Sequence, residues 1–440
     1  VECVGREGEP LRALKVIPKT KVKTDMKFVA LEVEAMLRVQ HPNVVKYYEY
    51  FEDAGSVYVV TELCTGGDFG ELHSNSCAPE EIRLLFRDVT LGMSYFHNVG
   101  IAHRDLKFEN CLLCTASGTR RMGKVIDFGL AGIRREGDTK GQWARESLGT
   151  KYFVAPEVLG REPRYGVKCD MWSLGVMMYI LLTDEHPLAG NAAELDSRSL
   201  FRLARIGKVR REPLRWSSVG QDAQKLILDL LVVRPETRPD AAKALEYDWL
   251  RPQQSQATFR DHALKPQGTE AMRRLQSFGA RSRFEKVVLM LAAHMATINE
   301  VKALSDGFIA IDTNASGTVS KDEFRNGLLS VSGVVDTSNL DFDALFAALD
   351  TNEDGVINYA EWLSGTVEPM HVASEKVMKD LFNFFDSDGK RGISLAELCA
   401  VIGDVEAKRV LQSGDTSGDG SLDYSEFQCI MKKIARGDNI

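Results

Sequence analysis

Acidic residues recur at a regular spacing in the C-terminal third of the chain, in four segments that begin at Asp312, Asp350, Asp386 and Asp415. A 12-residue calcium loop needs oxygen ligands at positions 1, 3, 5, 7 and 9, Gly at position 6 and Glu at position 12. Three of the segments satisfy this rule, with the backbone carbonyl acting at position 7. Their predicted ligands are Asp312, Asn314, Ser316, Thr318 and Glu323, then Asp350, Asn352, Asp354, Val356 and Glu361, then Asp415, Ser417, Asp419, Ser421 and Glu426. Three such segments between helical patterns predict an array of EF-hand calcium sites.

The third segment departs from the rule. Asp386, Asp388 and Glu397 are in place, but position 5 is Lys390 and position 6 is Arg391. A lysine ammonium has no acceptor, and a non-glycine residue in a left-handed turn costs about 1–2 kcal/mol. We therefore expect weak or absent calcium binding here, with the loop kept as a structural partner of the fourth. By acidic ligand count, the fourth site should bind best and the first weakest.

Three further motifs follow one another in the N-terminal part: HRDLKFEN at 103–110, DFG at 127–129 and APE at 155–157. Protein kinases carry these motifs in the same order. The chain therefore resembles a protein kinase, with residues 1–62 as the expected N-terminal lobe and 63–252 as the C-terminal lobe. Phosphoryl transfer depends on positioning and charge neutralisation more than on covalent chemistry. The resemblance implies ATP and Mg²⁺ as cofactors.

The resemblance also implies roles for the polar residues of these motifs. Asp105 would accept the proton of the substrate hydroxyl, and Lys107 would steady the transferred phosphate. Asn110 and Asp127 would offer the hard oxygen ligands that Mg²⁺ prefers. These four residues form the expected catalytic centre.

Nucleotide binding is assigned by the same resemblance to residues that precede the catalytic motifs. Lys15 would contact the α and β phosphates and Glu32 would hold it by an ion pair, although a lone Lys or Glu at such places is usually only solvated. The expected adenine and hinge residues are Ala13, Thr61, Glu62, Cys64 and Leu112. Apolar residues here would be buried in any fold, so the adenine contacts rest on the alignment alone.

Two residues carry the expectation about substrates. Asp68 matches the acidic position at which related kinases receive an arginine upstream of the target residue through a charge-assisted pair; the alternative is a merely solvated Asp. Thr150, just before the APE motif, would shape the substrate site. We therefore expect protein substrates with basic residues upstream of Ser or Thr.

Asp170 and Arg238 resemble buried structural residues of the family, and Arg238 would pair with Glu157.

A basic amphipathic helix is expected between the kinase-like region and the calcium loops. Its apolar face comprises Phe284, Val287, Val288, Leu291 and Met295. Such a helix is typical of a calmodulin-type target, although an ordinary packed helix has the same apolar face. Just upstream, Ser277 follows two arginines in a polar stretch, 251–280, expected to be a connector. That segment is interpreted as an inhibitory substrate mimic, a site of autophosphorylation, or simply a solvated connector.

The order of these parts resembles the calcium-dependent protein kinases of plants and apicomplexan parasites along essentially the whole chain. The implied fold is an α+β bilobal kinase followed by an all-α calmodulin-like domain, with an autoinhibitory junction at 253–300 and EF-hands at 301–440. The implied activity is calcium-activated transfer of the ATP γ-phosphate, blocked by the junction helix until calcium binds. The alternative is a calcium-regulated scaffold with a catalytically weak kinase fold.

Composition limits the other possibilities. The net charge of −8 is concentrated in the C-terminal third, which argues against nucleic-acid binding. The eight cysteines are scattered, so we expect reduced thiols in a cytoplasmic monomer, with Cys111 and Cys114 as small apolar residues near a strand. No apolar run reaches the ~18–20 residues of a membrane span. The family's glycine-rich loop would precede Val1, so any membrane anchor is expected only in a missing N-terminal part.

Overall fold

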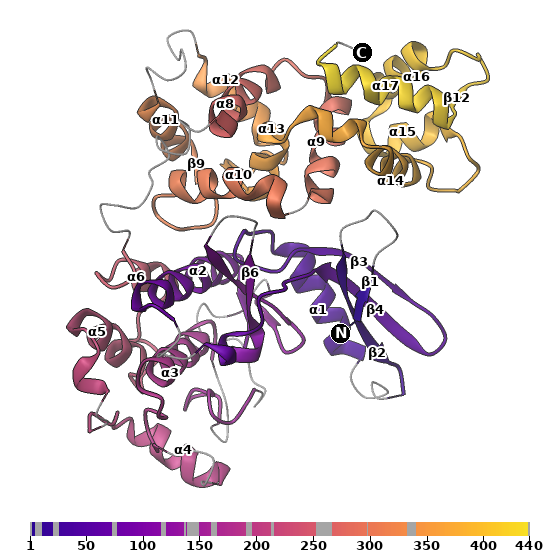
Figure 1. Cartoon of the computed structure of the whole chain (residues 1–440). Helices are drawn as coiled ribbons and strands as arrows, with labels where there is room; N and C mark the ends of the chain where they lie inside the picture. Colours follow the sequence, from indigo (N-terminus) through magenta and orange to yellow (C-terminus); the bar gives the residue numbers. More distant parts are fainter. Residues whose placement is uncertain are drawn as a thin grey trace. The chain divides into compact units, whose positions relative to one another are not determined.

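The structure is a computed structural model. It describes residues 2–4, 11–20, 26–72, 77–115, 120–135, 138, 149–159, 165–190, 196–212, 215–251, 266–296, 298–331 and 340–438. The chain divides into two compact units close to Gln256 (Figure 1). The predicted kinase motifs lie in the first unit and the calcium loops begin in the second.

The first unit opens with a four-stranded antiparallel sheet in the order β1-β2-β4-β3. Its strands are β1 (Glu2–Val4), β2 (Arg12–Pro18), β3 (Tyr47–Glu52) and β4 (Ser56–Glu62). Val57 and Val59 alternate with more exposed residues on β4, which is the pattern of a strand with one buried face. Helix α1 (Met26–Arg38) buries Ala35 and Met36. The register pairs Lys15 of β2 with Val59.

The rest of the first unit is mainly helical. Its elements are η1 (Phe69–Glu71), α2 (Pro79–Asn98), β5 (Ile101–Ala102), η2 (Phe108–Asn110), β6 (Cys111–Thr115), β7 (Arg121–Val125), β8 (Gly132–Ile133), α3 (Lys168–Thr183), α4 (Ser197–Ile206), η4 (Trp216–Ser218), α5 (Gln221–Leu230) and α6 (Ala241–Leu245). Two antiparallel pairs, β5 with β8 and β6 with β7, carry the catalytic-loop and DFG segments.

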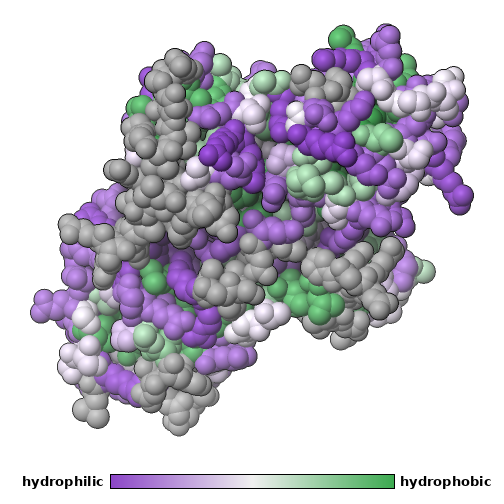
Figure 2. All heavy atoms as spheres, turned by 45° about the horizontal axis from the view of Figure 1, so that its top comes forward, coloured by the Kyte–Doolittle hydropathy of each residue, from purple (hydrophilic) through white to green (hydrophobic). Residues whose placement is uncertain are grey.

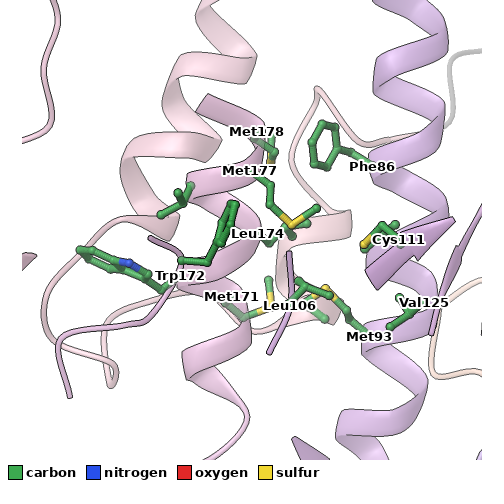
Figure 3. Close-up of a cluster of buried hydrophobic side chains, with 14 of the residues drawn as sticks. Phe86, Met93, Leu106, Cys111, Val125, Met171, Trp172, Leu174, Met177 and Met178 are labelled. Atoms are coloured by element: carbon green, nitrogen blue, oxygen red, sulfur yellow. The ribbon is translucent and has the colours of Figure 1, made fainter. Parts of the chain in front are cut away.

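Helix α3 is apolar on all sides and forms the centre of this helical part, because a helix of that kind is stable only when it is surrounded. Figure 3 shows Met171, Leu174, Met177 and Met178 of α3 in one cluster with buried side chains of α2 and β6. The same cluster includes Leu106 of the catalytic loop. The segment that carries the predicted catalytic residues is therefore fixed directly on the core.

In its described residues, the second unit is helical apart from two short strand pairs. Its elements are α8 (Pro266–Phe278), α9 (Arg283–Met295), α10 (Ile298–Ile311), β9 (Val319–Ser320), α11 (Lys321–Ser330), α12 (Phe342–Leu349), β10 (Val356–Ile357), α13 (Tyr359–Thr366), η5 (Pro369–Ala373), α14 (Glu375–Phe385), β11 (Ile393–Ser394), α15 (Leu395–Ile402), α16 (Asp404–Gly414), β12 (Ser421–Leu422) and α17 (Tyr424–Arg436). The apolar residues at position 8 of the loops predict strand contacts, and these are present: Ile357 pairs with Val319, and Ile393 with Leu422.

The prediction of a polar connector at 251–280 is wrong for the part of that segment that the structure describes. Residues 266–278 form α8, and Ala271, Met272, Leu275 and Phe278 are buried in the core of the second unit. Helix α8 packs against α12 and α13. The many polar letters of this stretch hid an apolar stripe at helical spacing. The expected junction therefore belongs to the second unit from α8 onward.

Among the described residues, no single helix combines the length and hydropathy needed to cross a membrane. One pair, Arg283–Met295 with Glu300–Ile311, meets the criterion on length and composition when taken together, across a bend of 105°.

Candidate catalytic centre and calcium sites

Lys15, Glu32 and Asp127 meet in the first unit. The Lys15 ammonium lies 2.6 Å from a Glu32 carboxylate oxygen and 2.8 Å from Asp127 Oδ1. The predicted Lys15–Glu32 ion pair is therefore present. Burial alone would lower the pKa of Lys15, but the two carboxylates overcome this and raise it. Burial would raise the pKa of Asp127, but the charge of Lys15 lowers it. Lys15 is thus held as a cation and Asp127 as a carboxylate.

Asp105 is the hub of a second cluster. One of its carboxylate oxygens accepts hydrogen bonds from the backbone N–H and the hydroxyl of Thr150, at 2.9 and 2.7 Å. The other accepts from Lys107 Nζ at 2.8 Å and from the amide nitrogen of Asn110 at 3.3 Å. The Lys107 ammonium also donates to the Thr150 hydroxyl. These contacts fix the carboxylate in one orientation.

The buried carboxylate of Asp170 anchors the catalytic loop. That carboxylate accepts hydrogen bonds from the backbone N–H of His103 and of Arg104, both at 2.8 Å. Arg104 sits at φ +67°, a left-handed conformation that costs a non-glycine residue energy. Because Asp170 binds the two adjacent N–H groups, it stabilises this turn and sets the direction of the following Asp105.

The predicted Arg238–Glu157 pair is present at 2.8 Å, with the Arg238 side chain fully buried. Arg238 also donates to the Val232 carbonyl. A buried ion pair with further hydrogen bonds fixes the end of the activation segment to the helical core.

The end of β4, where the expected hinge begins, is anchored to the β6–β7 hairpin. Glu62 pairs with Lys124 of β7 at 2.9 Å, with both side chains almost buried. The Glu62 side chain is therefore a structural anchor. Ala13 and Thr61 are cross-strand partners, and they lie on the two strands next to this hinge.

Cys64 and Cys114 form a disulfide, which corrects the expectation that the cysteines are all reduced. Cys114 was predicted to be only a small apolar residue near a strand, but it forms this bridge. Leu112 lies on the same strand, β6, two residues before Cys114, and pairs with Asp68 in an isolated bridge. The hinge and β6 thus run side by side.

Asp68 has a structural partner. It is the N-cap of η1, and its carboxylate accepts a hydrogen bond from the Gly70 N–H at 2.7 Å. This cap fixes the direction of the Asp68 carboxylate.

Each of the four calcium loops ends in the same hydrogen-bonded helix cap, a capping box. The residue at position 9 caps the following helix, and the Glu at position 12 accepts a hydrogen bond from the backbone N–H of that cap residue. In the second loop Glu361 also accepts from the Thr351 and Asn352 N–H groups, and in the fourth Glu426 accepts from those of Thr416 and Ser417. The Glu that would ligate calcium is thus already directed into its loop.

The two Glu residues differ electrostatically. Burial raises the pKa of Glu361, outweighing the hydrogen bonds that oppose it. In the fourth loop burial also acts to raise the pKa, but hydrogen bonds from Asp423, Ser417 and Thr416 lower that of Glu426 to about 2. In the first loop, Glu323 accepts from the Ser320 N–H at 3.0 Å, and Asn314 accepts from the Ser316 N–H.

In the third loop, Asp386, Asp388 and Glu397 place carboxylate oxygens within 4.8 Å of one another. The Lys390 ammonium lies 2.7 Å from Asp388 and adopts the place of a counter-ion. Arg391 has φ +68°, the left-handed conformation that the glycine rule anticipates at position 6. The loop keeps its fold through hydrogen bonds from the Lys390 and Arg391 N–H groups to Asp386.

Helix α9 lies in the apolar interior of the second unit. Phe284 and Val288 are fully buried, and Val287, Leu291 and Met295 pack partly buried against the same cluster. The helix contacts α13 from the first EF-hand pair and α14, α15 and α16 from the second. The face of this unit that Figure 2 shows is mainly hydrophilic, with only scattered apolar side chains. The apolar side chains of α9 thus complete the unit's core.

Ser277 lies on α8 with an exposed side chain, and its hydroxyl donates to the Arg274 carbonyl. Arg274 in turn donates to the Thr366 carbonyl at the end of α13. This segment is therefore helical and attached to the second unit.

Comparison with known proteins agrees with this geometry. The protein kinase domain family matches residues 1–250, and the EF-hand family matches 304–329 and 342–364. The chain is therefore a protein kinase with an EF-hand region.

Sequence relatives match nearly the whole chain. Calcium-dependent protein kinase 4 of Plasmodium falciparum is 31% identical over 442 residues, covering 96% of this chain and 81% of that protein. Calcium-dependent protein kinase 28 of Oryza sativa is 34% identical over 441 residues, covering 98% and 80%. Calcium-dependent protein kinase 7 of Arabidopsis thaliana is 29% identical over 443 residues, covering 98% and 79%. The chain belongs to the calcium-dependent protein kinase family, and it is a calcium-activated serine/threonine kinase that uses ATP.

Sequence reasoning missed three contacts of the site. The Thr150 hydroxyl bonds to Asp105 itself, and Lys124 anchors the hinge. Arg135 of the activation segment makes a two-pronged contact with Glu34 of α1, at 2.6 and 2.7 Å. All three contacts join segments whose proximity only the fold creates.

Proposed function

We propose that Asp105 is the general base of phosphoryl transfer to a serine or threonine hydroxyl. The observation that carries this is the set of four hydrogen bonds that Thr150, Lys107 and Asn110 donate to its carboxylate. They fix the direction of the carboxylate, and a general base must be positioned in this way before the substrate arrives. The substrate proton passes to Asp105 as the hydroxyl oxygen attacks the γ-phosphorus, and Lys107 compensates charge on the transferred group.

Mg²⁺ fits the donor set of Asn110 and Asp127. Asn110 uses its amide nitrogen on Asp105, which assigns its amide oxygen to the metal, and Asp127 is held ionised beside Lys15. Mg²⁺ bound through few side chains neutralises charge on the ATP phosphates. Lys15, fixed by Glu32, adds a second positive charge for the α and β phosphates.

Autoinhibition by the junction helix is the proposed link between calcium and catalysis. Without calcium, α9 and its flanks block the kinase; with calcium, the EF-hand unit holds α9 and the block is removed. The burial of Phe284 and Val288 in the EF-hand core supports the calcium-bound half of this cycle. Opened EF-hand pairs bind apolar helices in this way.

A pair of matched variants tests the role of α9. Val287→Asp and Leu291→Asp put a charge on the partly buried face and should weaken the hold on α9, so calcium should activate less. Met290→Asp puts the same charge on the same helix outside the core cluster and should activate normally. Equal calcium activation of all three variants and the parent would remove α9 from the switch.

Substrate choice is assigned to Asp68. Its partly exposed carboxylate would pair with an arginine upstream of the target residue. Asp68→Asn keeps the N-cap but removes the charge, so it should lower kcat/KM for an Arg-x-x-Ser peptide and leave a peptide without arginine unchanged. Equal losses on both peptides would refute the pairing.

The remaining proposals concern the protein's setting. We propose a cytoplasmic monomer, and the small number of scattered cysteines supports the location. Sedimentation at working concentration tests the oligomeric state, and cell fractionation tests the location.

A further inference from the structure

The segment after β4 runs beside β6 at unusually close range. The Gly66 N–H donates to the Leu113 carbonyl at 2.8 Å, and the Leu113 N–H donates to the Gly67 carbonyl at 2.9 Å. A Cβ atom at Gly66 would lie 2.5 Å from the Leu113 oxygen, so only glycine permits this approach. The pairing brings Cys64 and Cys114 together with their Cα atoms 4.7 Å apart, within the range that a disulfide spans.

The two cysteines differ in access. Cys64 is partly exposed, whereas Cys114 is 3% exposed. Cys111, on the same strand, is fully buried, and burial raises the pKa of its thiol far above the usual value. An oxidant can therefore reach Cys64, and Cys114 is the thiol placed to resolve the product.

The other cysteines of known state set this pair apart. Cys77, Cys111, Cys169, Cys399 and Cys429 are free thiols in the described part of the chain. Within the described part of the chain, one bridge among otherwise free thiols is typical of a redox-responsive pair in a reducing compartment.

The bridge joins two parts of the nucleotide site. Cys64 belongs to the hinge, and Cys114 follows Leu112 on the strand that leaves the catalytic loop after Asn110. The Glu62–Lys124 ion pair already ties the start of the hinge to the same hairpin. The disulfide adds a second, covalent tie two residues further along.

We propose that Cys64 and Cys114 form a reversible redox site that sets the affinity of the kinase for ATP, with a peroxide as oxidant and a dithiol as reductant. The Cys64 thiolate attacks one oxygen of hydrogen peroxide, the O–O bond breaks, and Cys64 becomes a sulfenic acid. The Cys114 sulfur then attacks the Cys64 sulfur and the S–O bond breaks. Overall, two thiols and one peroxide give one disulfide and two waters, and a dithiol reverses the reaction.

The direction of the effect follows from the bridged structure. With the disulfide in place, the Lys15–Glu32 pair and the Lys15–Asp127 contact are both assembled. The bridge therefore accompanies a competent site, and its reduction frees the hinge. This step rests on the proposed nucleotide role of the hinge. Reduction should raise KM for ATP several-fold with a smaller change in kcat, and lower the melting temperature of the kinase unit.

The experiment uses the full chain at saturating calcium, treated with hydrogen peroxide or with dithiothreitol. Non-reducing peptide mapping should find a Cys64–Cys114 peptide only after oxidation, and the KM for ATP should be lower in that form. Cys114→Ser should match the reduced parent in activity and show no response to peroxide. Cys429→Ser removes an exposed thiol elsewhere and should respond as the parent does.

Two results would overturn the proposal while leaving the kinase function intact. One is an oxidised parent that lacks the cross-linked peptide. The other is a KM for ATP that is equal in the bridged and reduced parent. Both are read on the parent protein, so they decide the question even if Cys114→Ser does not fold.

Discussion

In the catalytic centre, Lys15 and Asp127 touch although they are 112 residues apart, whereas each calcium loop gathers its predicted ligands within one short segment. The catalytic groups depend on buried supports such as Asp170 and Arg238. The calcium loops depend on their own turns and capping boxes. We infer that catalysis is sensitive to changes far from the reacting atoms, while each calcium site can be altered almost alone.

The largest expected effect is on turnover in Asp105→Asn. Loss of the general base should lower kcat by about 10²–10⁴-fold, because an amide cannot accept the substrate proton. Calcium binding, measured by titration calorimetry, should not change, since the loops are built locally. The exposed Asp222 in α5 supplies the control, Asp222→Asn, which should retain full activity. Near-normal turnover in Asp105→Asn would refute the assignment of the base.

The next effect is on stability in Arg238→Met. Removing the guanidinium leaves Glu157 as a nearly buried, unpaired charge, which should cost about 3–5 kcal/mol of unfolding free energy in the first unit. Denaturant unfolding measures this loss. Arg234→Met changes an exposed arginine close by and should cost little. If both variants unfold alike, the buried pair is not the support described here.

A smaller effect is expected when two loops lose their position-12 carboxylate. Glu361→Gln with Glu426→Gln should raise the calcium concentration for half-maximal activation by roughly tenfold or more, since affinity follows ligand charge. The maximal rate should remain. Glu353→Gln changes a Glu at position 4 of the second loop, outside the ligand rule, and serves as the control. An unmoved calcium curve in the double variant would exclude these sites from the switch.

The smallest effect is a gain in the third loop. Lys390→Asp with Arg391→Gly removes the internal counter-ion and the strained turn, so one additional weak calcium should bind. Calorimetry would detect it as added stoichiometry. Lys379→Asp places a negative charge on the neighbouring helix α14 and should add no site. Unchanged stoichiometry in the loop variant would show that other features prevent binding there.

The same contrast explains how much the sequence alone could predict. The loop ligands, the strand contacts and the left-handed Arg391 follow from local spacing, and the kinase motifs are short. The Cys64–Cys114 bridge and the Glu62–Lys124 pair depend on how a hinge approaches a hairpin, which no local pattern encodes. Helix α8 was missed because four buried apolar residues were diluted by polar neighbours. Burial of that stripe, rather than helix propensity, decides its structure.

The central claim is that calcium in the EF-hand unit controls phosphate transfer in the kinase unit. The direct measurement is the rate of transfer to an Arg-x-x-Ser peptide by the full chain across a calcium titration with a chelator at its origin. We predict very low transfer with chelator and a steep rise as calcium is added. Equal transfer with and without calcium, or none under either condition, would contradict the account.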